Sequence, residues 1–277
     1  MPDTMLAKSE PLERFAPAQI HPTALVSRGA ELGAGVRIGP FCTVGPNVVI
    51  EDGVELVSHV VVDGHTHIKT GARLYPFCTI GLPPQDFKYR GEPTRCEIGP
   101  RTIIREHCTI HRGTVTGKGV TRVGNDCMLM AVAHVAHDCT IGDHVIIANN
   151  VVMGGHVSIA DHAVIGGSAA IHQFVRIGRA AMVGGVSGVE GDVIPFGSVI
   201  GNRARLAGLN VIGLKRRGFN KAEIQRLHAA FRVLFGRTGV FVTRLAETRE
   251  RYGNDPLVAE ILAFIDAPSH RGLIRVE

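Results

Sequence analysis

Two histidines and an aspartate stand close together near the middle of the chain. They are His134, His137 and Asp138, in the stretch AHVAHDC at residues 133–139. A neutral imidazole, with an unperturbed pKa of about 6.5, accepts a proton from a hydroxyl group at neutral pH, and a neighbouring carboxylate fixes which ring nitrogen carries the proton. The stretch therefore indicates a site at which an imidazole acts as a general base.

Two other interpretations of these histidines stay open. Exposed turn positions accept histidine at no cost, and more histidines occur in the same part of the chain, namely His111, His144, His156, His162 and His172. The His-x-x-His spacing of His134 and His137 also suits zinc, which some repeat proteins bind through histidines of adjacent subunits. The pair beside an aspartate, close to two polar insertions, favours acid–base chemistry, with zinc as the rival.

The elements that must position these residues follow a six-residue repeat. Every sixth residue from Val123 to Val189 is apolar, and eleven of these twelve residues are Ile, Leu or Val. The same period runs from Ile20 to Ile80. Neither an amphipathic helix nor an isolated alternating strand keeps this period. The repeat predicts a solenoid of short parallel strands and turns, whose coils stack at a spacing of about 4.8 Å.

A second interior position is expected four residues after each aliphatic residue, where the chain has small or β-branched residues. Five of the six cysteines occupy it, so we expect them to be reduced core residues: Cys42, Cys78, Cys108, Cys127 and Cys139. Glycine directly follows several aliphatic residues, as in Gly142 and Gly178. These glycines predict turn conformations that disfavour a Cβ atom.

The repeat is interrupted twice, at 81–97 and at 111–122, by sequences rich in proline, glycine and charged residues. A thin apolar coil has no room for such residues inside, so we expect two loops that leave the solenoid. Loops that depart from a regular solenoid are natural places for function.

The chain is expected to divide into an N-terminal arm at 1–19, a parallel β-helix at 20–200 and an α-helical domain at 201–277 that covers the open end of the solenoid. Capping signals and helical periodicity predict three helices in the last part, at 221–235, 240–252 and 256–266.

Composition limits the class of protein. Gly is abundant at 34 residues, Trp is absent and aromatic residues make up 5%, which suits a thin core of medium-sized aliphatics. The first seventeen residues are polar and include acidic groups, so they predict no secretory signal. No apolar run approaches the roughly 18 residues of a membrane span. We therefore expect a cytoplasmic protein, whose net charge of +5 suits an anionic ligand or an acidic partner but does not indicate nucleic acid.

Several motifs together closely resemble the acyl-ACP:UDP-N-acetylglucosamine O-acyltransferases of lipid A synthesis, a branch of the hexapeptide-repeat acyltransferase superfamily. Besides the repeats, the motifs are QDFKYRGEPTR at 85–95, TIHRGT at 109–114, AHVAHDC at 133–139, IHQF at 171–174 and NVIGLKRRGF at 210–219. The likeness extends from about Ile20 to Arg275. It implies a mainly β protein, a left-handed parallel β-helix followed by a small C-terminal α-helical domain. Periodicity alone does not predict left-handed coiling, because parallel crossovers are usually right-handed.

The resemblance also implies a cytosolic homotrimer with active sites between subunits. The expected reaction moves an (R)-3-hydroxyacyl group from acyl carrier protein to the glucosamine 3-hydroxyl of UDP-N-acetylglucosamine. No metal, resident cofactor or covalent intermediate is expected, because phosphopantetheine arrives on the carrier protein and a base with an oxyanion donor suffices.

By the same resemblance, His137 is the general base, Asp138 orients it, and the backbone N–H of Gly155 stabilises the oxyanion. Ten further residues match positions that contact the substrates: Asp86, Lys88, His111, His134, His156, His172, Gln173, Asn210, Arg216 and Arg217.

Two residues bear on specificity. Gly185 matches the position that limits acyl length, and a residue without a side chain should leave the groove open to a longer chain. Ile212 replaces a glutamate of the family motif, so uridine contacts at that point are in question. The alternatives are an N-acyltransferase, acting on a 3-amino sugar or on UDP-3-O-acyl-glucosamine, a zinc-dependent γ-class carbonic anhydrase, and a purely structural solenoid.

Overall fold

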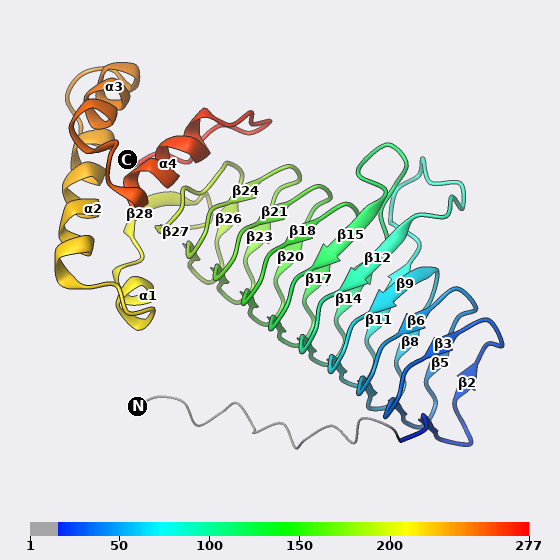
Figure 1. Ribbon diagram of the computed structural model, residues 1–277. Coiled ribbons are helices and arrows are strands. Elements are labelled where there is room, and N and C mark those ends of the chain that lie inside the picture. Colours follow the sequence, from blue (N-terminus) through cyan, green and yellow to red (C-terminus); the bar gives the residue numbers. More distant parts are fainter. Residues whose placement is uncertain (1–15, 277) are drawn as a thin grey trace.

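The structure of the chain is a computed structural model that describes residues 16–276. Short parallel strands wind into a left-handed parallel β-helix, and the helices lie at its C-terminal end (Figure 1). The predicted fold class is confirmed. Most of the arm expected at 1–19 lies outside the described residues, and the first strand begins at Gln19.

The β-helix has three flat sheets because each strand pairs with the third strand after it. Arg37 pairs with Glu55, and Glu55 with Arg73, so an undisturbed coil takes 18 residues, from 37 to 55. The first sheet contains β1 (Gln19–Ile20), β4 (Arg37–Ile38), β7 (Glu55–Leu56), β10 (Arg73–Leu74), β13 (Ile103–Ile104), β16 (Met128–Leu129), β19 (Ile146–Ile147), β22 (Val164–Ile165), β25 (Met182–Val183), β27 (Gly197–Ile200) and β28 (Arg205–Leu209).

The other two sheets follow the same rule. The second contains β2 (Leu25–Val26), β5 (Thr43–Val44), β8 (Val61–Val62), β11 (Thr79–Leu82), β14 (Thr109–His111), β17 (His134–Val135), β20 (Val152–Met153), β23 (Ala170–Ile171) and β26 (Gly188–Val189). The third contains β3 (Glu31–Leu32), β6 (Val49–Ile50), β9 (His65–Ile68), β12 (Arg95–Ile98), β15 (Val120–Val123), β18 (Thr140–Ile141), β21 (Ser158–Ile159) and β24 (Arg176–Ile177).

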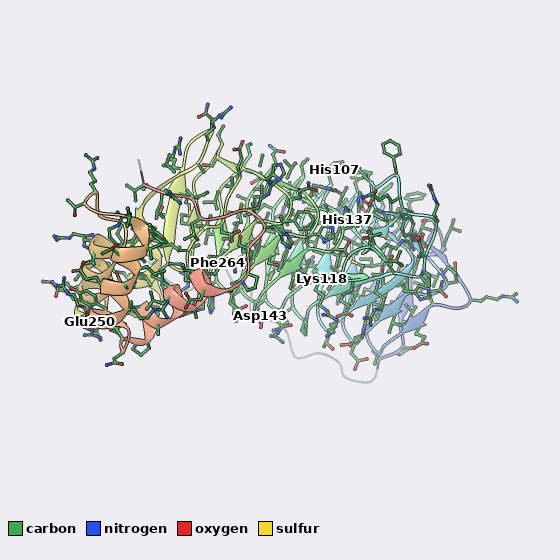
Figure 2. All side chains as sticks on the ribbon, turned by 90° about the horizontal axis from the view of Figure 1, so that it is seen from above. His107, Lys118, His137, Asp143, Glu250 and Phe264 are labelled. Carbon is green, nitrogen blue, oxygen red and sulfur yellow. The ribbon has the colours of Figure 1, made fainter. Side chains whose placement is uncertain are left out.

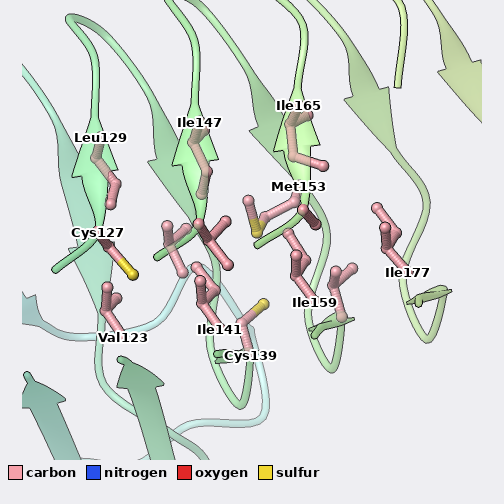
Figure 3. Packing of buried hydrophobic residues seen from close by; sticks show 14 of the residues in the cluster. Val123, Cys127, Leu129, Cys139, Ile141, Ile147, Met153, Ile159, Ile165 and Ile177 are labelled. Carbon is pink, nitrogen blue, oxygen red and sulfur yellow. The ribbon is translucent and has the colours of Figure 1, made fainter. Parts of the chain in front are cut away.

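The repeat buries its aliphatic residues as expected. Val135, Ile141 and Ile147 are at most 2% exposed, and Figure 3 shows Ile141 and Ile159, one coil apart, stacked in the interior. Burial of one such side chain contributes about 1.5–3 kcal/mol. The five cysteines predicted to be reduced core residues are buried with free thiols, and Cys96 is as well.

The turns obtain their left-handed residues mostly without glycine. The third residue after an interior aliphatic has a positive φ, as in Asp138 (59°) and His156 (63°). Gly142 and Gly178, for which we expected unusual conformations, have no positive φ, so that expectation was wrong. Close packing between coils requires glycine there instead, because a Cβ at Gly142 would lie 2.2 Å from Oδ1 of Asp161.

Two loops leave the β-helix at the same corner, between the second and third sheets. They span 83–94, between β11 and β12, and 112–119, between β14 and β15. The expected bounds of 81–97 and 111–122 were too wide, because β11, β12, β14 and β15 extend into them and continue the ladder of backbone hydrogen bonds. The bases of the two loops are joined, since the Arg95 N–H donates to the Gly119 carbonyl at 2.9 Å.

The C-terminal part begins with a strand, which differs from the purely α-helical domain expected at 201–277. β28 pairs antiparallel with β27 and ends the first sheet. Four helices follow: α1 (Val211–Arg216), α2 (Lys221–Leu234), α3 (Phe241–Tyr252) and α4 (Pro256–Asp266). The last three match the predicted ones to within a residue, and Asn220 and Glu223 form the expected capping box of α2.

The helices pack against the last coils through buried aliphatic side chains and ion pairs. Leu214 and Leu227 are fully buried, and Arg179 of the last coils pairs with Glu260 of α4 at 2.9 Å. Covering the end of a solenoid protects its unpaired sheet edges. Within the described residues, no helix has the length and apolarity that crossing a membrane requires.

Candidate active site

One corner of the β-helix gathers most of the predicted catalytic residues. It consists of the turns that follow β17, β20 and β23, and we call it the histidine corner. His137, Gly155 and Gln173 occupy the second position after these strands. They are separated by one coil each, so neighbours along the corner lie about 4.8 Å apart. The two loops leave the β-helix at this corner, in the coils just before it.

His137 and Asp138 form a hydrogen-bonded pair. Nδ1 of His137 lies 2.8 Å from Oδ2 of Asp138, and the exposed fractions of the two side chains are 17% and 0%. An ionised carboxylate only accepts hydrogen bonds, so Nδ1 carries the proton. Nε2 of His137 therefore keeps a free lone pair, which is what a general base requires.

Loop 112–119 folds over Asp138 and surrounds its carboxylate with donors. The hydroxyl of Thr114 donates to Oδ2 at 2.6 Å, and the backbone N–H groups of Lys118 and Gly119 donate to Oδ1 at 2.8 and 3.1 Å. Burial by itself raises the pKa of Asp138, but hydrogen bonds from His137 and Thr114 outweigh burial and lower it to about 2. The carboxylate is thus ionised at neutral pH.

Gly155 lies directly against the imidazole of His137. A Cβ atom at Gly155 would approach Cε1 of His137 to 2.5 Å and Nε2 to 2.7 Å. In the described part of the chain, the N–H of Gly155 donates to no protein acceptor. A free backbone donor beside Nε2 is the arrangement that an oxyanion formed at this point needs.

His156 lies one coil further along the corner. Its ring stacks on Phe174 with centroids 4.5 Å apart and meets the ring of His137 edge-on at 5.1 Å. Burial lowers the pKa of His156, although the Asp138 carboxylate acts in the opposite direction. The ring is therefore neutral at neutral pH.

His111 and His134 lie on the outer face of the second sheet, next to the corner. Their ring centroids are 5.0 Å apart, and Nδ1 of His134 is 2.7 Å from the hydroxyl of Thr109. Burial, with a smaller contribution from His134, lowers the pKa of His111 to about 4. Nδ1 of His111 is buried and has no hydrogen-bond partner within residues 16–276.

Loop 83–94 places Asp86 and Lys88 near the same corner. The N–H of Lys88 donates to Oδ1 of Asp86 at 3.0 Å, which holds the two residues together. The Asp86 carboxylate is close enough to act on the pKa of His156. Figure 2 shows His137 and Lys118 of the second loop together in the middle of the β-helix.

His172 and Gln173 continue the corner toward the C-terminus, and both are exposed. The guanidinium of Arg271 contacts the ring of His172 and donates to the carbonyl of Gln173 at 2.9 Å. The C-terminal tail therefore reaches the site. We did not predict a role for Arg271, nor for Thr114, Lys118 and Gly119, because their partners are distant in sequence.

Other predicted residues lie at different corners of the chain. Asn210 caps α1, because its Oδ1 accepts from the N–H of Gly213 at 3.0 Å, and its Nδ2 donates to the carbonyl of Ala180 at 2.9 Å. Arg217 holds α1 against the corner after the third sheet through the carbonyl of His162. A single chain does not bring these residues to the histidine corner.

The remaining predicted residues are more open to solvent. Arg216 and Ile212 lie on α1, and Ile212 is 67% exposed. Gly185 belongs to the turn after β25, at the third corner. The nearest atom to a Cβ placed on Gly185 would be the Gly167 carbonyl oxygen, at 3.2 Å. Gly185 is exposed, but a Cβ there would be in tight contact with this backbone oxygen.

Ligand atoms of His137, Asp138 and His156 lie within 4.8 Å of one another, which is close enough for a metal ion. His134 is not part of this group, so the predicted His-x-x-His pair does not form it. The carboxylate of Asp138 already accepts hydrogen bonds from Thr114, Lys118 and Gly119 as well as His137. A metal ion would have to displace these donors, so the group suits a hydrogen-bonded pair better than a metal site.

The comparisons with known proteins agree with this geometry. Residues 192–274 match the family described as Udp N-acetylglucosamine O-acyltransferase, domain 2, and residues 29–64 and 121–155 match the bacterial transferase hexapeptide family. The chain is 52% identical over 256 residues to the acyl-[acyl-carrier-protein]–UDP-N-acetylglucosamine O-acyltransferase of Azorhizobium caulinodans, covering 92% of this chain and 94% of that protein. It is 49% identical to the protein of the same name from Bartonella quintana, over 91% of this chain and 92% of that protein.

Solved structures give the same result. The UDP-N-acetylglucosamine acyltransferase of Bacteroides fragilis superposes with a TM-score of 0.89 at 36% identity, covering 93% of this chain and all of that one. The enzyme of the same name from Francisella novicida also gives a TM-score of 0.89, at 35% identity, over 93% of this chain and 94% of that one. From the repeat, the hydrogen-bonded pair and these relatives, we conclude that the chain belongs to the family of acyl-[acyl-carrier-protein]–UDP-N-acetylglucosamine O-acyltransferases.

Proposed function

We propose that the protein transfers an (R)-3-hydroxyacyl group from acyl carrier protein to the 3-hydroxyl of UDP-N-acetylglucosamine, the first step of lipid A synthesis. The observation that carries this proposal is the 2.8 Å hydrogen bond between His137 and a fully buried Asp138, beside Gly155, in a member of this family. The pair supplies a general base oriented by a carboxylate, and Gly155 supplies a free backbone donor.

The reaction needs no group beyond these. Nε2 of His137 takes the proton of the sugar hydroxyl while its oxygen attacks the thioester carbon. The carbonyl oxygen becomes an oxyanion, which the N–H of Gly155 stabilises. The carbon–sulfur bond then breaks, and the thiolate of the carrier's phosphopantetheine receives the proton from His137. Asp138 stabilises the imidazolium that exists between these two proton transfers.

The surrounding histidines are suited to bind the substrates as neutral hydrogen-bonding groups. Burial lowers the pKa values of His111, His134 and His156, so these rings are neutral at neutral pH. Neutral imidazoles donate and accept hydrogen bonds with sugar and amide groups. Together with Asp86, Lys88, His172 and Gln173 they form our proposed contacts to the sugar and the acyl chain.

We also propose a homotrimer in the cytoplasm, where both substrates are available. Asn210, Arg216, Arg217 and Gly185 lie at corners other than the histidine corner, so a substrate that touches all of them needs a second copy of the chain. Asn210 and Arg217 are partly engaged in holding α1, which leaves Arg216 as the freer cation for a phosphate group. Ile212 has no polar atom in its side chain, so uridine contacts there rest on other groups.

The test is acyl transfer from 3-hydroxymyristoyl carrier protein to UDP-N-acetylglucosamine, measured for the intact protein and for His137→Ala. Loss of a general base should lower kcat by about a hundredfold or more. Circular dichroism and thermal unfolding control for folding of the variant. Full activity of His137→Ala would reject the proposed mechanism.

The same assay separates the alternatives. Transfer to a 3-amino sugar or to UDP-3-O-acyl-glucosamine, without transfer to UDP-N-acetylglucosamine, would indicate an N-acyltransferase. Stoichiometric zinc with carbon dioxide hydration would indicate a γ-class carbonic anhydrase, against which the hydrogen-bonded state of Asp138 already argues.

A further inference from the structure

Loop 112–119 surrounds the carboxylate of Asp138 with hydrogen-bond donors. Thr114 provides two donors: its hydroxyl lies 2.6 Å from Oδ2, and its N–H is shared between Oδ2 at 3.1 Å and Oδ1 at 3.2 Å. Lys118 and Gly119 donate their N–H groups to the other oxygen, Oδ1, at 2.8 and 3.1 Å. Among the donors of this loop, the Thr114 hydroxyl is the one directed at Oδ2 alone.

The loop itself is built for this contact. Thr114 is 3% exposed, and its carbonyl accepts from the N–H groups of Gly117 and Gly119 at 3.1 and 3.0 Å, which closes the loop on itself. A Cβ atom at Gly117 would lie 2.4 Å from Cγ of Asp138, so only glycine lets the loop come this close. The carboxylate is thus enclosed on the side opposite His137.

Oδ2 is the oxygen that faces His137, and the Thr114 hydroxyl is its shortest contact. Charge-assisted hydrogen bonds of this length are strong and directional. Without the hydroxyl, Oδ2 would keep a weaker N–H contact, while the Lys118 and Gly119 donors on Oδ1 would remain. The carboxylate would then be held mainly through Oδ1, so Oδ2 would be less firmly directed at the ring of His137, whose tautomer it fixes.

We propose that Thr114 is a positioning residue of the reaction, which holds Oδ2 of Asp138 toward Nδ1 of His137 and so keeps Nε2 ready to accept a proton. This inference rests on the proposed function. Thr114 does not touch the substrates in this account, because Asp138 and His137 lie between it and the reacting atoms. Its removal should therefore change kcat and leave KM unchanged.

The first experiment compares Thr114→Val, which keeps the shape and removes the hydroxyl, with Thr114→Ser, which keeps the hydroxyl. We expect Thr114→Val to lower kcat about tenfold to a hundredfold, the range for loss of one hydrogen bond to a charged group, with KM within about twofold. Thr114→Ser should keep at least about a third of kcat. Equal losses in both variants, or a rise in KM alone, would overturn the proposal.

Thr102→Val is the matched control. Thr102 is also a buried threonine, with its hydroxyl donating to the Gly124 carbonyl at 2.7 Å and accepting from the Cys127 N–H at 3.1 Å. It lies at a different corner and contacts none of the residues assigned to the site. Its loss should lower thermal stability as Thr114→Val does but leave kcat unchanged, which separates positioning from folding.

A double-mutant cycle tests whether Thr114 acts through Asp138. In an Asp138→Ala background, Thr114→Val should cause almost no further loss of kcat, because the two residues act as one unit. An undiminished loss in that background would show that Thr114 acts by another route and would contradict the inference.

A measurement without substrates distinguishes failure of this inference from failure of the proposed function. Nitrogen-15 NMR of the His137 ring should show one tautomer, with the proton on Nδ1, in the intact protein, in Thr114→Ser and in Thr102→Val. Thr114→Val should show a mixture of tautomers. An unchanged tautomer in Thr114→Val would overturn the role of Thr114, whereas absence of acyl transfer in the intact protein would count only against the proposed function.

Discussion

At the scale of single residues, the site works by giving neighbouring groups different protonation states. Asp138 is fully buried yet ionised, because hydrogen bonds from His137 and Thr114 outweigh the cost of burial. His111 and His134 are neutral because burial disfavours their charged forms. Among the histidines of the site, His137 is the one that is hydrogen-bonded to a carboxylate, which is why it is our proposed base.

The state of His111 predicts a pH dependence of stability. Its pKa in the folded chain is about 4, below the value of about 6.5 in the unfolded chain, so the unfolded chain binds more protons between these pH values. The free energy of unfolding should therefore fall as the pH drops from about 6.5 to about 4. Urea denaturation should show that His111→Gln removes on the order of 2 kcal/mol of the loss between pH 7 and pH 5.

His228→Gln serves as the control for that experiment, because His228 lies on α2 with its side chain exposed. The control should keep the full loss of stability at low pH. If His111→Gln and the intact protein lost stability equally between pH 7 and pH 5, the buried and neutral state of His111 would be wrong.

Gly185 predicts the acyl length. Because Gly185 is exposed and has no side chain, the intact protein should turn over a fourteen-carbon 3-hydroxyacyl carrier faster than a ten-carbon one. Gly185→Met would fill this space and should reverse the order. Competition assays with both carriers measure the ratio directly, and a preference of the intact protein for ten carbons would reject this role of Gly185.

At the scale of elements, each two-residue strand separates an interior from an exterior position. In β19, Ile147 is fully buried and its neighbour Ile146 is 38% exposed. Turns at each corner then place polar side chains at fixed intervals. The regular coils therefore space polar side chains evenly along each corner. The two loops that leave the β-helix at the histidine corner add further polar groups to the site.

This alternation predicts unequal effects of the same substitution in β19. Ile147→Ala should lower the free energy of unfolding by about 2–5 kcal/mol, because it leaves a cavity in a core one side chain thick. Ile146→Ala, the matched control, should change it by about 0.5 kcal/mol or less. Chemical denaturation of both variants gives the comparison, and similar losses would contradict the assignment of the interior face.

At the scale of the whole molecule, the three corners carry different parts of the proposed site. His137 and its neighbours lie at one corner, the contacts of α1 at a second and Gly185 at the third. A triangular column cannot fold its own corners together, because each coil is held rigidly by the coils on either side. Assembly with other copies is the route by which these groups reach one substrate.

That argument predicts the mass of the assembly. Light scattering after gel filtration should give three times the chain mass of 29.6 kDa, which is about 89 kDa. Activity should fall on dilution only where the mass falls as well. A monomer with full activity would contradict both the trimer and the proposal that sites lie between subunits.

The sequence by itself determined the parallel β-helix, its interior positions, the helices after residue 220 and the general place of the loops. This was possible because each solenoid coil packs only against its neighbouring coils. A local period of six residues is then enough to identify the residues that face the interior. The resemblance added the left-handed coiling and the list of site residues.

Only the tertiary structure decided which residues complete the site. Thr114, Lys118 and Gly119 are about twenty residues from Asp138 in sequence, yet they hold its carboxylate because the loop leaves the coil directly below it. The repeat carries no information about the loops that interrupt it. The conformation predicted for Gly142 and Gly178 was wrong because close contacts between coils, rather than turn angles, require glycine there. Regular packing can be predicted from sequence since it repeats, whereas the irregular contacts that give Asp138 its charge and His137 its orientation occur once.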